Sequence, residues 1–93
     1  MTTAERVAAA LGTMAAAARP ASGGWSTAER LVIELADGRS VFAKCAHEEP
    51  VIEFLHTEHA FYEAVRGDFM PEFLTFLDDG PPVLVLEDLS AGQ

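Results

Sequence analysis

The sequence predicts an α+β domain, in which an antiparallel sheet of about five strands carries one packed helix and follows a short N-terminal helix. Apolar segments occur in pairs around turn signals, one pair around Asp37-Gly38 and one around residues 78–82. Between these pairs, apolar residues from Val51 to Val65 recur at steps of three and four. The pairs predict hairpins, and the repeat between them predicts the packed helix.

The first element is expected to be a short helix. Thr2 and Glu5 have the spacing of a capping box, and the alanine-rich segment after them favours a helix that ends at Gly12. The alanines of residues 13–19 favour a helix by propensity alone. Residues 20–26 have the composition of a loop.

Residues 26–44 allow two interpretations. Ser26 and Glu29 have the spacing of another capping box, which would start a helix that runs to Leu35. Against this, the Asp37-Gly38 turn signal lies between residues 31–35 and 40–44, as in a hairpin. We choose two antiparallel strands.

The helix from Val51 is expected to begin after the stretch Glu48-Glu49-Pro50 and to end at Gly67, since acidic residues and proline favour a helix start. Residues 73–77 and 83–86 then form the second hairpin.

Two charged residues, Lys44 and Glu58, stand in apolar segments. Lys44 ends the strand at 40–44, and Glu58 lies within the apolar stripe of the helix, which comprises Val51, Phe54, Leu55, Phe61, Tyr62 and Val65. Burying either charge alone would be costly, so we expect the two side chains to form an ion pair.

Three motifs occur in order: Val-Phe-Ala-Lys at 41–44, Glu-His-Ala-Phe-Tyr at 58–62 and Val-Leu-Val-Leu-Glu-Asp-Leu at 83–89. Together they resemble the small lobe of the aminoglycoside phosphotransferase and choline kinase-like family. The resemblance implies a strand at 13–19, which we adopt. It also implies that residues 1–93 form a single kinase-like N-terminal lobe without the second, catalytic lobe.

The resemblance implies a site for ATP. Lys44 would orient the α- and β-phosphates, and Glu58 would hold its ammonium group. Gly23, Gly24 and Ser26 would belong to the loop over the phosphates, since glycine lets backbone N–H groups approach oxygen atoms closely.

Adenine would bind at the other end of the same cleft. Phe42 shares a strand face with Lys44, at a position where similar proteins usually have a smaller aliphatic residue. Residues 86–89 resemble the segment that links the two lobes. By this analogy the Glu87 carbonyl and the Leu89 amide would bind adenine, next to Leu86.

Enzymes of this family also need a catalytic aspartate, an asparagine and a second aspartate for Mg²⁺, which the resemblance assigns to the second lobe. We therefore expect an inactive lobe whose partners are a nucleotide and that second lobe, which also selects the phosphate acceptor. The alternative is a non-catalytic interaction module of the same fold. A third interpretation treats the motifs as coincidence in a small domain.

Composition excludes several classes of function. Six basic and fifteen acidic residues give a net charge of -9, which disfavours nucleic acid and anionic membranes as partners. The N-terminal stretch, interrupted by Gly12 and Pro20, is unlike a signal peptide or a membrane span, so we expect a cytoplasmic protein.

No metal site is expected. Cys45 is the single cysteine, so it has no disulfide partner, and a cysteine-based zinc site lacks ligands. His56 and His59 could share a metal ion only if a third ligand lay nearby.

The face that would bind the nucleotide should be exposed in the isolated lobe. Phe42, Leu86 and Leu89 would then form an apolar patch, through which two copies of the chain could associate as a homo-oligomer.

Overall fold

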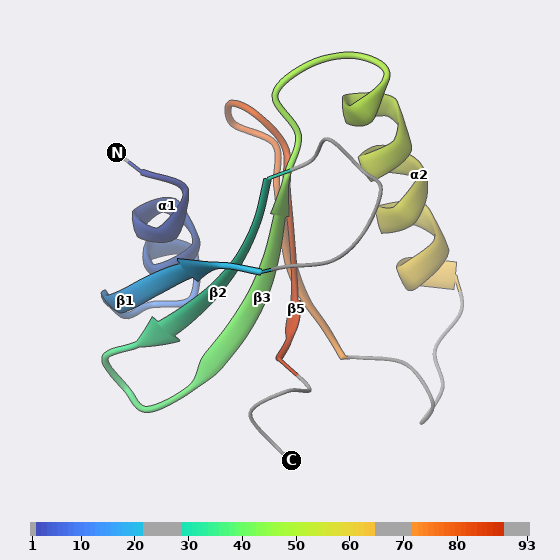
Figure 1. Ribbon diagram of the computed structural model, residues 1–93. Coiled ribbons are helices and arrows are strands. Elements are labelled where there is room, and N and C mark those ends of the chain that lie inside the picture. The colour runs from blue at the N-terminus through green and yellow to red at the C-terminus, as the bar shows by residue number, and fades with distance from the viewer. Residues whose placement is uncertain (1, 22–28, 65–71, 89–93) are drawn as a thin grey trace.

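The computed structural model describes residues 2–21, 29–64 and 72–88 (Figure 1). The predicted α+β fold is confirmed. Five strands form one antiparallel sheet in the order β1-β2-β3-β5-β4. The elements are α1 (Thr3–Ala10), β1 (Ala15–Pro20), β2 (Glu29–Leu35), β3 (Ser40–Cys45), α2 (Val51–Ala64), β4 (Phe73–Leu77) and β5 (Val83–Glu87).

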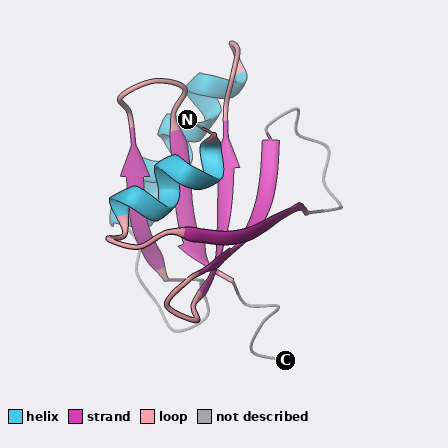
Figure 2. Cartoon of the chain, turned by 90° about the vertical axis from the view of Figure 1, so that its left-hand side faces the viewer, coloured by secondary structure: helices cyan, strands magenta, loops and turns pink. Residues whose placement is uncertain are grey.

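The two helices cover opposite faces of the sheet. Figure 1 shows α1 on one side and α2 on the other, and Figure 2 shows α1 in front of the sheet with α2 behind it. In the described part of the chain, no helix is long and apolar enough to cross a membrane.

The predicted capping box starts α1. Thr2 Oγ1 accepts a hydrogen bond from the Glu5 amide at 3.1 Å, and Glu5 Oε1 accepts one from the Thr2 amide at 2.9 Å. The chain leaves the helix through Gly12, whose φ of 79° is accessible to glycine at little cost. The segment 15–20 then forms strand β1. The resemblance implied a strand here, whereas the propensity of alanine favoured a helix.

The turn at Asp37-Gly38 joins β2 and β3, which confirms the hairpin and excludes the alternative helix through Leu35. Gly38 has a φ of 95°, which few other residues adopt. The Asp37 carboxylate accepts hydrogen bonds from the Arg39 side chain at 2.9 Å and from the Arg39 amide at 3.0 Å. These bonds lower the pKa of Asp37 and fix the turn.

The main core lies between the sheet and α1. Its centre is Ile33 from β2, Val41 from β3 and Val85 from β5, which pack against Val7 of α1. Each of the four is at most 1% exposed. Alternation along the strands sends every second side chain to this face.

A smaller core lies under α2, where Leu84 and Leu86 of β5 pack with Ala46 and Leu55. Leu55 is the one residue of α2 that is fully buried. Part of the predicted apolar stripe is therefore wrong, because Phe54 is 63% exposed and Phe61 is 52% exposed. Both lie roughly 100° around the helix from Leu55, outside the face that meets the sheet.

Arg6 connects α1 to the turn between β4 and β5. Its guanidinium donates to Asp79 Oδ1 at 2.7 Å and to the Pro81 carbonyl at 2.9 Å. The arginine side chain is 14% exposed and the Asp79 side chain 81% exposed. The hydrogen bond from Arg6 is the main cause that lowers the pKa of Asp79.

Leu55→Ala should lower the free energy of unfolding by about 2–5 kcal/mol, because it leaves a cavity at the centre of the core under α2. Phe54→Ala, one residue earlier on the exposed side, is the matched control and should cost far less. Urea denaturation measures both. Equal losses in the two variants would contradict the observed orientation of α2.

Acidification should destabilise the wild type more than Arg6→Met. The pKa of Asp79 is lower in the folded state, so the pair stabilises the fold above the ordinary aspartate value of about 3.9. This contribution is lost as the pH falls through the folded-state pKa. Urea denaturation between about pH 6 and about pH 3 tests it, with Arg19→Met as the control that should behave like the wild type. A pH dependence of Arg6→Met equal to that of the wild type would refute this role of the pair.

Candidate functional site

The predicted ion pair between Lys44 and Glu58 is present. Lys44 lies near the end of β3 with its side chain on the α2 face, and its Nζ is 2.8 Å from Glu58 Oε2. The lysine side chain is 21% exposed and that of Glu58 40% exposed. The ammonium group is thus held by the carboxylate while part of the side chain still reaches solvent.

Glu58 is oriented by the packing of α2 on the sheet. Leu55, one turn earlier, is buried against Leu84 and Leu86. One residue after Glu58, the ring of His59 lies 4.1 Å from the ring of Phe76 on β4, measured between centroids. These contacts on either side of Glu58 direct its side chain toward β3.

Tyr62 lies one turn beyond Glu58 and packs at the border of the core under α2. Burial raises the pKa of Tyr62, and the negative charge of Glu58 raises it further. The phenol therefore remains protonated and neutral at physiological pH. It adds no charge to the surroundings of the ion pair.

Arg30 on β2 is directly opposite Lys44 on β3. Directly opposed residues of antiparallel strands project on the same face, so two basic side chains lie side by side on the α2 face. Sequence reasoning missed Arg30. A two-residue turn at Asp37-Gly38 would pair residue 44 with residue 31, whereas the observed loop has three residues, 36–38, between the paired residues Leu35 and Arg39, which shifts the pairing of Lys44 to Arg30.

The residues predicted near adenine lie at the other end of β3. Phe42 is opposite Leu86, and Val41 is opposite Glu87, so β5 ends one residue beyond the position opposite Phe42. Phe42 shares a face with Lys44, two residues further along the strand. The side chain of Ser40 donates to Asp88 Oδ2 at 2.8 Å and holds the end of β5 against β3.

The prediction that Leu86 contributes to an exposed apolar patch is wrong. Leu86 is 4% exposed, because it packs with Leu55 in the core under α2. The Glu87 amide donates to the Glu72 carbonyl at 2.9 Å, and the Glu87 carboxylate accepts from the Glu72 amide at 3.0 Å. Glu87 thus joins β5 to the start of β4.

Four of the predicted binding residues lie outside the described part of the chain: Gly23, Gly24, Ser26 and Leu89.

His56 and His59 are both engaged with aromatic rings. The ring of His56 meets Phe76 edge-on at 5.3 Å, and the ring of His59 stacks on Phe73 at 5.2 Å. His56 Nε2 also lies 3.8 Å from Asp78 Oδ1, and His59 forms an ion pair with Glu63. Both histidines therefore pack between α2 and β4.

Comparisons with protein-family models, curated proteins and solved structures found no match to the chain.

Lys44→Met should change the free energy of unfolding by no more than about 1 kcal/mol, because a partly exposed ion pair contributes little to stability. The methionine keeps the apolar stem of the lysine against the sheet. Glu58→Gln is the companion variant and should behave alike. If urea denaturation shows that both variants lose more than about 2 kcal/mol of unfolding free energy, the ion pair serves to stabilise the fold.

Proposed function

We propose that these 93 residues act as the nucleotide-binding N-terminal lobe of an ATP-dependent small-molecule phosphotransferase and are inactive by themselves. The observation that carries the proposal is the ion pair of Lys44 with Glu58 at 2.8 Å. It joins the middle strand of the sheet to the helix that follows it. A strand lysine held in this way suits a phosphate-binding role, because its position is fixed while its charge stays near solvent.

The basic pair on the α2 face supports this role. Arg30 and Lys44 are opposite each other, although the chain as a whole has a net charge of -9. Two cationic side chains on one face can both donate charge-assisted hydrogen bonds to phosphate oxygens.

The position of β5 supports adenine binding beside Phe42. In this proposal the aromatic ring contacts the base, and the backbone carbonyl at Glu87, where β5 ends, would recognise it. Phe42 and Lys44 share a strand face about 7 Å apart along the strand, so base and phosphates would lie along the same surface.

The alternative function is a protein-interaction module, and one observation favours it. Phe54 and Phe61, separated by two turns of α2, are both more than half exposed on its outer side. Exposed aromatic residues are typical of protein interfaces. A nucleotide titration separates the two functions, because the interaction module does not require ATP.

The chain should bind ATP through Lys44 and Arg30. Displacement of a fluorescent ATP analogue by ATP measures the affinity. A hydrogen bond to a charged group contributes about 1.5–3 kcal/mol, so Lys44→Met and Arg30→Met should each weaken binding by roughly tenfold or more. Arg6→Gln removes the same charge on the α1 face of the sheet, opposite to the proposed site, and is the control for net charge. Equal affinity in the wild type and Lys44→Met would exclude the proposed site.

The 93-residue chain should not transfer phosphate, even where it binds ATP. Transfer needs Mg²⁺ between the β- and γ-phosphates and an aligned acceptor hydroxyl. In kinases an asparagine contributes to the metal site, and this sequence contains none. Radiolabelled ATP with aminoglycosides and choline-like alcohols provides the assay. Turnover that Lys44→Met abolishes would place the whole reaction within this chain, contrary to the proposal.

A further inference from the structure

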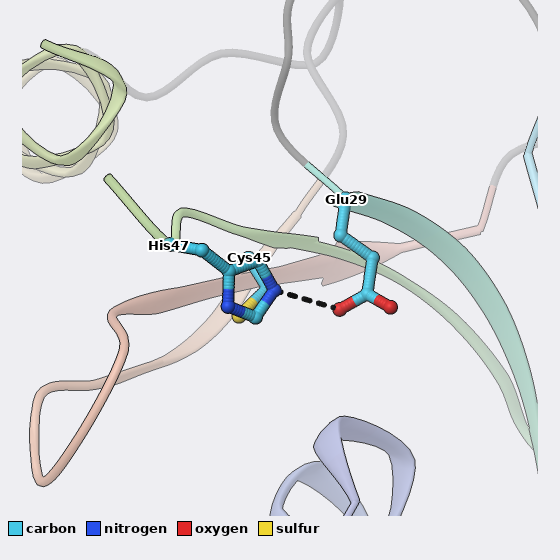
Figure 3. Close-up of side chains that lie close together, drawn as sticks. All are labelled: Glu29, Cys45 and His47. Carbon is cyan, nitrogen blue, oxygen red and sulfur yellow. Dashed lines mark hydrogen bonds and ion pairs between the residues drawn. The ribbon is translucent and has the colours of Figure 1, made fainter. Parts of the chain in front are cut away.

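A second cluster of polar side chains lies where β2 begins and β3 ends, at the end of their hairpin away from the turn. Glu29 is the first residue of β2 and is directly opposite Cys45, the last residue of β3. His47 follows two residues later. One ligand atom from each side chain, a carboxylate oxygen, the cysteine Sγ and an imidazole nitrogen, lies within 4.8 Å of the other two. Figure 3 shows Glu29 and the ring of His47 facing each other, with the sulfur atom beside the ring.

We propose that Glu29, Cys45 and His47 form a binding site for Zn²⁺, with water as the fourth ligand. Thiolate, imidazole and carboxylate are all ligands of Zn²⁺, and the sulfur atom disfavours the harder ions Mg²⁺ and Ca²⁺. The site is on the α1 face of the sheet, whereas the neighbouring residue Lys44 projects on the α2 face. The inference is therefore independent of the proposed nucleotide function.

The spacing of the three ligands fits a tetrahedral ion after small side-chain movements. Around tetrahedral Zn²⁺, ligand atoms lie roughly 3.5 Å from one another. His47 Nε2 and Glu29 Oε1 are already 3.2 Å apart. Their side chains are 55% and 42% exposed, so both can move, whereas buried Cys45 is held in the strand. An ion here would have sulfur on its inner side and water on its outer side.

Thr3 supports the carboxylate from the first turn of α1. Its hydroxyl donates to Glu29 Oε1 at 3.2 Å, which orients the carboxylate, and the second lone pair of the same oxygen remains available for the ion. Arg6 is the nearby cation, and its guanidinium is bound to Asp79 and to the Pro81 carbonyl. These bonds direct the positive charge of Arg6 to the β4–β5 turn.

Charge also favours a divalent ion. When Zn²⁺ binds, the Zn–S bond replaces the S–H bond and the proton passes to water. His47 would bind through Nε2 with its proton on Nδ1. Thiolate and carboxylate then balance the two charges of the ion around a neutral imidazole.

The test is titration of the purified chain with Co²⁺ as a spectroscopic substitute, followed by displacement with Zn²⁺. A thiolate bound to tetrahedral Co²⁺ gives a near-ultraviolet charge-transfer band and intense visible bands. The proposal expects both, together with a Zn²⁺-dependent increase in the melting temperature. Cys45→Ala should abolish the charge-transfer band, and Glu29→Gln and His47→Gln should weaken Zn²⁺ binding at least about tenfold.

His56→Gln is the matched control, because it removes a histidine from α2 outside the cluster. Its Zn²⁺ affinity should stay within about twofold of the wild type. His47 is exposed and can be replaced without disturbing the core. His47→Gln therefore tests the proposed Zn²⁺ site even if Cys45→Ala fails to fold. Absence of the charge-transfer band in the wild type, or equal affinities in the wild type and His47→Gln, would overturn the proposal.

Discussion

The register of the β2–β3 hairpin is the constraint on which both candidate sites depend. The tight turn at Asp37-Gly38 fixes it, and β3 lies at the centre of the sheet with a helix over each face. Because side chains alternate along a strand, Lys44 and Cys45 project on opposite faces although they are adjacent in sequence. A slip by one residue would exchange the two faces and bring the lysine into the apolar core under α1.

The two faces of the sheet differ in how firmly they are covered. On one face α1 contributes two buried residues, Val7 and Ala8, to the main core. On the other, α2 has the single buried residue Leu55, and its contacts with β4 include the rings of His56 and His59 against Phe73 and Phe76. A few contacts therefore determine where Glu58 lies relative to Lys44. Small shifts of α2 would alter the ion pair without disturbing the main core.

Local patterns in the sequence predict six of the seven elements, because capping residues, turn signals and apolar periodicity act over short distances. The capping box at Thr2 and the turn at Gly38 are examples. The segment 15–20 is the exception, since its alanines favour a helix and pairing with β2 overrides that preference. The orientation of α2 was predicted only in part, because Phe54 and Leu55 are equally apolar and the sheet decides which of them is buried.

The ion pair was predicted because each charge interrupts an apolar pattern. Arg30 and Glu29 have no such signal, since basic and acidic residues are ordinary at the start of a strand. Their roles emerge only when the register places them opposite Lys44 and Cys45. The burial of Leu86 was missed for a similar reason. It depends on α2 packing over the end of β5, a contact between segments far apart in the sequence.

Strand β1, at one edge of the sheet, is built in a way that discourages fibril growth. An edge strand is a template on which another chain can add a strand. In β1 the pairing is irregular between Ala15 and Ala17, and the strand ends with Arg19 and Pro20. A bulge, a charged side chain and a residue without an N–H group each weaken such a template. Small, uncharged side chains such as those of this alanine-rich strand favour cross-β stacking. The three features protect the strand against it.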